Sequence, residues 1–302
     1  MFASFASVFL SAILSALPFL LLGCVFSGAA QVYFRPEDLA RLIPRQPVLA
    51  ALAGSLLGLF LPTGDAGTLP LARRLAIKGA PPALVMAFLA SAPSLNLVAA
   101  AASLAALGPG LLFWGRLGMT LVIGWSTGMI FSLEVGSAAL FRFPAPSGQG
   151  PEPASLEPSP GDATARPAPS LDRAIQVSVD DFFHFGAFAV LGAALAALAR
   201  LGLPQALLLS AGPGPLARCA ALAGLGFVYS SSSMEIAFTG LGLARSVSAG
   251  PLLAFLVFAP VFDLKRLPVT FATLRARPAL YLGLVSFAMT LAMSLAIAYL
   301  NP

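Results

Sequence analysis

Charged residues are scarce in this chain of 302 residues: Asp, Glu, Lys and Arg make up 10% of it, while hydrophobic residues make up 58%. A soluble domain carries about 25% charged residues. The core of a soluble protein of this length does not absorb so much apolar surface, and several uncharged runs are long enough to cross a bilayer. The composition excludes an ordinary soluble protein and predicts an all-α polytopic membrane protein.

Cysteine and histidine are nearly missing, with two cysteines and one histidine in the chain. Cys24 and Cys219 lie far apart in apolar segments, so the sequence offers neither a disulfide framework nor a cluster with metal-ligand spacing. It also has no nucleotide-binding loop, nucleophile elbow, zincin motif or paired-cysteine redox motif. We therefore expect no enzyme activity, no metal, no cofactor and no ATP coupling within the chain.

Basic residues exceed acidic ones, which gives a net charge of +5. The chain has no basic patch interleaved with aromatic residues, so no nucleic-acid partner is expected. The bases flank apolar runs instead, as expected of residues that set orientation in a membrane. The expected partners are the lipid bilayer and a small-molecule or ion substrate, and a homo-oligomer is left open.

A proline-rich stretch divides the chain into two parts. Residues 144–171 combine proline with small and charged residues, a composition that predicts a disordered linker. It separates a predicted first membrane repeat, 1–143, from a second, 172–302. Residues 4–30 have no basic start and a long apolar run, which predicts a first spanning helix and not a signal peptide.

The two parts share sequence in the same order. Residues 87–97 read AFLASAPSLNL and residues 254–264 read AFLVFAPVFDL, with six identical positions that include Pro93 and Pro260. Residues 50–54 and 220–224 both read AALAG, and at that spacing Asp65 corresponds to Glu235. These matches predict two homologous halves, each with a proline and a polar side chain inside an apolar run, as in duplicated transporters.

Two topologies fit these halves. Hydropathy alone counts about eight membrane segments, four in each half, which makes the repeats parallel. Two of the segments, at 79–115 and 246–262, are broken by proline. If both are re-entrant, each half has three crossings and the repeats are inverted. The positive-inside rule favours the second topology only weakly.

Asp65 and Glu235 are the first candidates for the functional site. A carboxylate at the centre of a bilayer costs about 2.5–3.5 kcal/mol on insertion scales, so it requires a partner, a cation or a proton. We expect one carrier of protons or cations in each half. The alternative is that each carboxylate lies hydrated at the membrane edge.

The remaining candidates lie beside the helix breaks. A proline frees a carbonyl about one turn earlier, so backbone oxygens near Pro93 and Pro260 could hold a polar ligand together with Asn96 and Asp263. Alternatively, Asp263 caps the chain and pairs with Lys265 or Arg266 at the interface. Hydroxyls next to the carboxylates, which serve equally as helix-packing groups, complete the set: Thr63, Thr68, Ser230, Ser231, Ser232, Ser233 and Thr239.

Several other residues have simpler interpretations. Residues 69–78 are expected at the membrane interface, with Arg73 and Arg74 as headgroup anchors. His184 fits an interfacial aromatic belt, with a proton relay as the alternative. The bases from Lys265 to Arg277 are expected to form a basic loop. Gly54, Gly58 and Gly224 are expected to allow close helix packing.

Spaced motifs in both halves resemble a known family. These are Leu69–Arg74, Lys78–Pro81 and the run from Ala87 to Asn96 in the first half, and Ser230–Glu235 and Leu253–Lys265 in the second. They resemble the predicted-permease family DUF318/UPF0718, which includes organoarsenical efflux permeases. The resemblance implies a multi-pass permease of the inner (plasma) membrane, with trivalent organoarsenicals as substrates of some members. Many members carry cysteines just before the motif that corresponds to Leu69–Arg74, where this chain has Gly64, Asp65 and Ala66.

The resulting hypothesis is a permease that moves a small solute across the inner membrane. It includes efflux of organoarsenical or other toxic compounds, coupled to protons or another ion. Soft-metal sites favour thiolate ligands, and this chain lacks the family's thiols at residues 64–66. The alternative is a non-transporting scaffold subunit that recruits partners through its linker.

Overall fold

A computed structural model describes residues 2–133, 140–142, 170–202, 214–229 and 232–300. Within these ranges the regular structure is helical, apart from one isolated antiparallel bridge between Phe141 and Leu274. The helices are α1 (Phe2–Tyr33), α2 (Pro36–Leu42), α3 (Pro47–Phe60), α4 (Thr68–Ile77), α5 (Pro82–Ser91), α6 (Leu97–Leu107), α7 (Leu111–Phe131), α8 (Leu171–Gly202), α10 (Pro215–Tyr229), α11 (Ser233–Leu243), α12 (Ala249–Val261), α13 (Leu267–Thr273) and α14 (Ala276–Leu300).

Three of the described helices are long and apolar enough to cross a membrane. They are the segments Phe5–Tyr33 of α1, Leu171–Gly202 of α8 and Ala276–Leu300 of α14. Shorter apolar helices of 10–17 residues fill much of the space between them: α3, α5, α6, α10 and α12. This confirms an all-α membrane protein with several apolar segments shorter than a full span.

The predicted breaks occur in both halves of the chain. The apolar run 79–115 is interrupted between α5, which ends at Ser91, and α6, which begins at Leu97. The second proline segment is interrupted between α12, which ends at Val261, and α13, which begins at Leu267. Two more interruptions separate α3 from α4 and α10 from α11. Most of the predicted linker at 144–171 lies outside the described residues.

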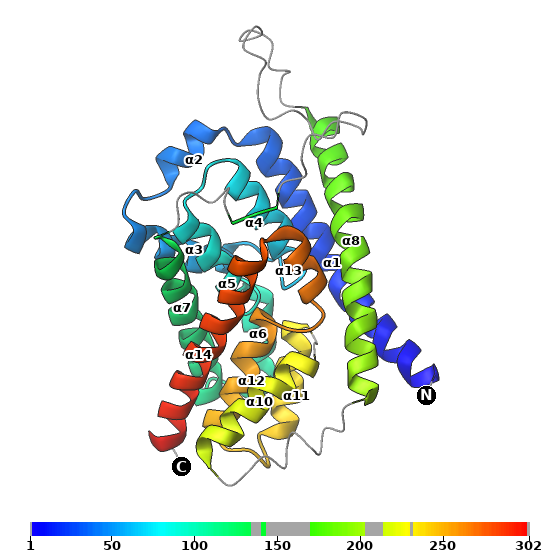
Figure 1. Ribbon diagram of the computed structural model, residues 1–302, viewed down its shortest axis with the longest axis vertical. Coiled ribbons are helices and arrows are strands. Elements are labelled where there is room, and N and C mark those ends of the chain that lie inside the picture. The colour runs from blue at the N-terminus through cyan, green and yellow to red at the C-terminus, as the bar shows by residue number, and fades with distance from the viewer. Residues whose placement is uncertain (1, 134–139, 143–169, 203–213, 230–231, 301–302) are drawn as a thin grey trace, which may run out of the picture.

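The helices form two packed groups (Figure 1). α1 and α8 pack along each other at one side of the molecule. The other helices form a bundle with α5 and α12 at its centre, where nearly every residue is buried. α4 packs against α1, and α13 packs against α8. These two short helices therefore connect the α1–α8 pair to the bundle.

Glycine lets the helices of the bundle approach closely, as expected for Gly54 and Gly58. A Cβ on Gly54 would collide with the backbone of Leu84 in α5, and one on Gly58 with the backbone of Ala92. The same expectation is wrong for Gly224, because no atom of the described residues lies within 4 Å of the position a Cβ would take there. Small residues thus bring α3 against α5, as in other membrane helix pairs.

Residues 69–78, expected at the membrane interface, are packed inside the protein. They form most of α4, in which seven of the 10 residues are buried. Arg74 donates a hydrogen bond to Asp181 in α8 over 2.9 Å and another to Ser27 in α1 over 3.2 Å. The arginine therefore joins α4 to the α1–α8 pair. His184 packs edge-on against Phe185 and Phe188 of its own helix.

Candidate functional site

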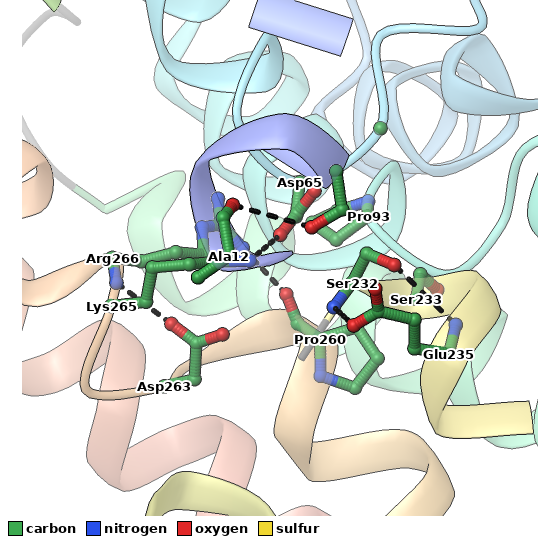
Figure 2. Close-up of polar contacts among 12 residues, drawn as sticks. Ala12, Asp65, Pro93, Ser232, Ser233, Glu235, Pro260, Asp263, Lys265 and Arg266 are labelled. Carbon is green, nitrogen blue, oxygen red and sulfur yellow. Dashed lines mark hydrogen bonds and ion pairs between the residues drawn. The ribbon is translucent and has the colours of Figure 1, made fainter. Parts of the chain in front are cut away.

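A buried ion pair occupies the centre of the molecule (Figure 2). Lys265 Nζ donates to Asp65 Oδ2 over 2.7 Å, across 200 residues of sequence. Asp65 lies in the interruption between α3 and α4, and Lys265 in the one between α12 and α13. Asp65 is 1% exposed and Lys265 4% exposed. The contact therefore joins two helix breaks, one from each half, away from solvent.

The loop that carries Asp65 is held by its own polar groups. Gly64 adopts a φ of 57°, a left-handed conformation that glycine adopts without steric cost. The Gly67 N–H donates to the Thr63 carbonyl over 3.0 Å, and the Thr68 hydroxyl donates to the Gly64 carbonyl. The two threonine hydroxyls lie 3.4 Å apart. Thr63 and Thr68 thus fix the turn that presents Asp65, with their hydroxyls directed into the loop itself.

Asn96 hydrogen-bonds to backbone groups on both sides of the break between α5 and α6. Its Oδ1 accepts a hydrogen bond from the Ala99 N–H over 2.8 Å and caps the start of α6. Its Nδ2 donates to the Ala92 carbonyl over 3.0 Å and to the Pro93 carbonyl over 3.2 Å. One amide side chain therefore supplies the acceptor for α6 and the donor for the end of α5.

In the break between α12 and α13, one residue accepts the backbone N–H and a second residue donates to the carbonyls at the helix end. Asp263 Oδ1 accepts from the Arg266 N–H over 2.7 Å. Arg266 Nη1 donates to the carbonyls of Pro260, over 2.7 Å, and Val261, over 2.9 Å. A carboxylate has no donor, so the guanidinium supplies what the Asn96 amide supplies in the other break. Asp263 is fully buried, and it caps the turn by accepting from Arg266, as one of the two sequence interpretations expected.

Glu235 is placed differently from Asp65. It lies in the first turn of α11 and forms a capping box with Ser232: the Ser232 N–H donates to Glu235 Oε2 over 3.3 Å, and the Glu235 N–H donates to Ser232 Oγ over 3.4 Å. Glu235 is partly buried, whereas Asp65 is fully buried. Thr239 donates to the Glu235 carbonyl. Ser231 lies outside the described residues.

Pro93 and Pro260 are both buried. They lie beside the ion pair in Figure 2, and their carbonyls accept the hydrogen bonds from Asn96 and Arg266. The two prolines therefore border one shared centre and do not face lipid on remote surfaces. The structure brings together Asp65, Asn96, Asp263 and both prolines, and it places Ser232 beside them.

Two small cavities flank Asp65. One, of about 20 Å³, is bordered by Asp65, Lys265 and Arg266 and by apolar side chains of α1 and α8, including Leu20 and Phe185. The other, of about 10 Å³, is bordered by Phe19, Gly64, Asp65, Asn96, Ala99, Ser232, Ser233 and Met234. A water molecule requires roughly 10–15 Å³. The centre is therefore closed in this arrangement, with room for about one water on each side of Asp65.

Comparison with protein families identifies the chain. A family described as "Predicted permease" (ArsP_1) matches residues 1–299. The chain belongs to this predicted permease family. It is also similar to the UPF0718 protein YcgR of Bacillus subtilis (strain 168), with 30% identity over 91% of this chain and 90% of the relative.

A second relative of this permease is described as "Putative two-component membrane permease complex subunit", from Streptococcus mutans serotype c. It is 28% identical over 86% of this chain and 84% of its own length. No solved structure matches the chain. Membership of a permease family, together with the apolar helices, supports a membrane transporter rather than an enzyme.

Sequence reasoning missed the basic residues of the permease's centre. Lys265 and Arg266 were expected in a basic loop, yet they are 4% and 5% exposed. Arg116 in α7 is fully buried and was not among the candidates. One signal could have identified the first two: they stand two and three residues after Asp263, where the Asn96 motif of the first half continues with the apolar residues Val98 and Ala99. Replacing an amide by a carboxylate at such a break calls for a nearby cation.

Proposed function

We propose that this protein is a secondary-type permease of the inner membrane, with several membrane crossings, that moves a small polar solute. The proposal rests on one observation: the Asp65–Lys265 ion pair, 2.7 Å long, joins two helix interruptions in the buried centre of the molecule. Transporters built from repeats bind substrate and coupling ions at interrupted helices near the middle of the bilayer. We assign substrate and coupling-ion binding to Asp65, Lys265, Asn96 and Asp263 with the neighbouring carbonyls.

We further propose that the chain consists of two inverted halves. α1 and α3–α7 would correspond to α8 and α10–α14, with the hairpins α3–α4 and α10–α11 entering from opposite sides. In support, α5 and α6 follow one another down the view of Figure 1, while α12 and α13 follow one another up it. The contact of α6 with α11 also has a counterpart in the contact of α13 with α4. Each half would then contribute one hairpin and one broken helix to the centre.

The ion pair suits a transport site because each charge is costly when left alone. Insertion scales assign about 2.5–3.5 kcal/mol to a charged side chain at the bilayer centre. When a proton, a cation or a charged solute binds to one of the two side chains, the other side chain loses its partner and must bind a new ligand. This coupling gives the pair a way to link binding to rearrangement, whereas an isolated carboxylate at the membrane edge offers none.

The side chains at the centre favour a polar solute over a thiophilic one. No cysteine borders either cavity beside Asp65 in the part of the chain that the structure describes. Cys24 and Cys219 are buried elsewhere, in α1 and α10. We propose efflux of a toxic compound that binds through oxygen or nitrogen atoms. If the substrate is an organoarsenical, this chain would bind it without thiolate ligands.

A growth screen tests the function. A deletion strain would be exposed to metalloids, organoarsenicals and drugs and complemented with the wild-type gene or with the double variant Asp65→Asn, Glu235→Gln. We expect the wild type to restore growth on at least one compound class, and the double variant to lose pH-dependent transport of that compound in proteoliposomes. Unchanged pH-dependent transport by the double variant would remove Asp65 from the proposed coupling and reject the carrier role that the sequence predicts for Glu235.

A scaffold subunit is the second candidate, and one observation favours it: the Streptococcus mutans relative is described as a subunit of a two-component complex. Deleting residues 144–170 separates the two. A permease should keep transport without this segment, because the centre lies within the helical halves. A scaffold should lose partner capture in a pull-down, with unchanged membrane insertion as the control. Loss of transport together with loss of a partner would favour the scaffold.

A further inference from the structure

Six charged side chains belong to the central region, and their charges are not equally compensated. They are three carboxylates, Asp65, Glu235 and Asp263, and three bases, Arg116, Lys265 and Arg266. Lys265 is paired with Asp65. Arg266 donates to two carbonyls at the C-terminal end of α12, and its backbone N–H donates to Asp263 Oδ1, three residues earlier in the turn. Both of these bases therefore lie against negative charge or against the negative end of a helix dipole.

Arg116 has only neutral partners. Its Nη1 donates to the Ser103 hydroxyl over 2.7 Å, and its Nη2 donates to the Ser233 carbonyl over 2.9 Å and the Ser233 hydroxyl over 2.7 Å. Its Nε has no acceptor among the described residues. The two ion pairs found in the described part of the chain do not include it. Arg116 is 0% exposed, so water does not solvate its charge.

The position of Arg116 makes this charge still less favourable. Ser233 is the first residue of α11, a helix of 11 residues, so the guanidinium lies at the positive end of that helix dipole. A cation at a helix N-terminus is repelled, and an anion is attracted. Neutral hydroxyl and carbonyl groups satisfy the N–H donors but do not cancel a buried charge. An anion beside Arg116 would remove both costs at once.

The surroundings supply the rest of an oxyanion site. Ser233 also borders the cavity of about 10 Å³ next to Asp65, together with Ser232 and Asn96. A guanidinium presents its N–H groups as a planar fork that matches two oxygens of a carboxylate or phosphate. The hydroxyls of Ser103 and Ser233 are ligands that an incoming oxygen can displace when the cavity opens.

We propose that Arg116, with the hydroxyls of Ser103, Ser232 and Ser233 at the start of α11, is an oxyanion-binding subsite, and that the transported solute carries a carboxylate or phosphate-like group. This inference rests on the proposed permease function and specifies its substrate class. Arg116 binds the anionic group next to Ser233, while Asp65, which borders the same cavity as Ser233, and its partner Lys265 respond to the remainder of the solute.

Binding to the full-length protein in detergent tests the subsite. The melting temperature would be measured with sodium acetate, sodium phosphate or sodium chloride at equal ionic strength, for the wild type, Arg116→Gln and Arg218→Gln. Arg218 is an exposed base on α10 and serves as the matched control. We expect acetate or phosphate to stabilise the wild type and the control more than chloride does, and Arg116→Gln to bind that anion at least tenfold more weakly.

The pattern across the three salts separates a binding role from a structural one. If Arg116 only joins α6 to α11, no oxyanion will exceed chloride in the wild type, and the inference is overturned. It is equally overturned if Arg116→Gln keeps the full oxyanion shift. Should Arg116→Gln not fold, Arg116→Lys keeps the charge without the fork, and an undiminished shift in that variant would contradict bidentate binding.

Transport distinguishes this inference from the function on which it rests. Proteoliposomes would be tested for uptake of the radiolabelled anion that gives the larger shift. Binding without any transport would retain the subsite and reject the permease. Transport of an uncharged compound with no oxyanion binding would retain the permease and reject the subsite.

Discussion

Replacing Lys265 by methionine is expected to be among the most damaging single changes in this protein. Asp65 would remain buried at 1% exposure without the cation that neutralises it. Removing one partner of a buried ion pair typically costs about 3–5 kcal/mol, because the remaining charge stays in a low-dielectric interior. We expect a large fall in melting temperature in detergent and loss of transport in proteoliposomes.

The double variant Lys265→Met, Asp65→Asn is the matched control. It removes both charges, and replacement of a whole buried pair by neutral groups is often close to neutral for stability. We expect the double variant to recover most of the lost melting temperature but none of the transport. A single Lys265→Met variant as stable as the wild type would show that Asp65 does not depend on this pair. A double variant that transports normally would remove the pair from the mechanism.

Substituting Gly192 by alanine is expected to separate α8 from the central break. A Cβ at this position would collide with the carbonyl oxygen of Lys265, which is backbone and cannot rotate away. Overpacking of this kind costs about 1–3 kcal/mol. Because the displaced residue is Lys265 itself, we expect reduced transport as well as a lower melting temperature.

Gly186→Ala in the same helix provides the comparison. A Cβ there would lie 3.9 Å from the Leu20 side chain, an ordinary contact. Alanine favours a helix over glycine by roughly 0.8–1 kcal/mol, so Gly186→Ala should be neutral or slightly stabilising. Equal melting temperatures and transport rates for the two variants would show that α8 does not fix the position of Lys265.

Local rules predicted where the helices break. Pro93, Asn96, Pro260 and Asp263 stand in matching positions inside apolar runs, and a proline followed by a short polar side chain favours a helix break because both act on nearby backbone groups. Asn96 caps α6 as its side chain permits, and Asp263 accepts the corresponding N–H in the second half. The buried Asp65 was also a candidate from the sequence, because a lone carboxylate in apolar surroundings requires a partner.

The same local rules did not predict which charged residues pair across long sequence distances. Asp65 and Glu235 correspond in the predicted repeat, yet Asp65 pairs with Lys265 while Glu235 stays in its own capping box with Ser232. The sequence match sets Val98 against Lys265, so it offers Glu235 no basic residue equivalent to Lys265. Arg74 likewise meets Asp181 because α4 packs on α1 and α1 packs on α8, an arrangement that a hydropathy pattern does not encode.

The sequence alone determined that this is an all-helical membrane protein of a permease family, with interruptions at two related prolines. Composition, periodicity and helix breakers act over a few residues, so they can be read without knowledge of the fold. Tertiary structure alone decided which charges meet: Lys265 with Asp65 across 200 residues, and Arg116 with serine hydroxyls and no carboxylate within the described residues. The electrostatic free energy of a buried charge depends on the groups that pack against it, and those neighbours come from distant parts of the chain.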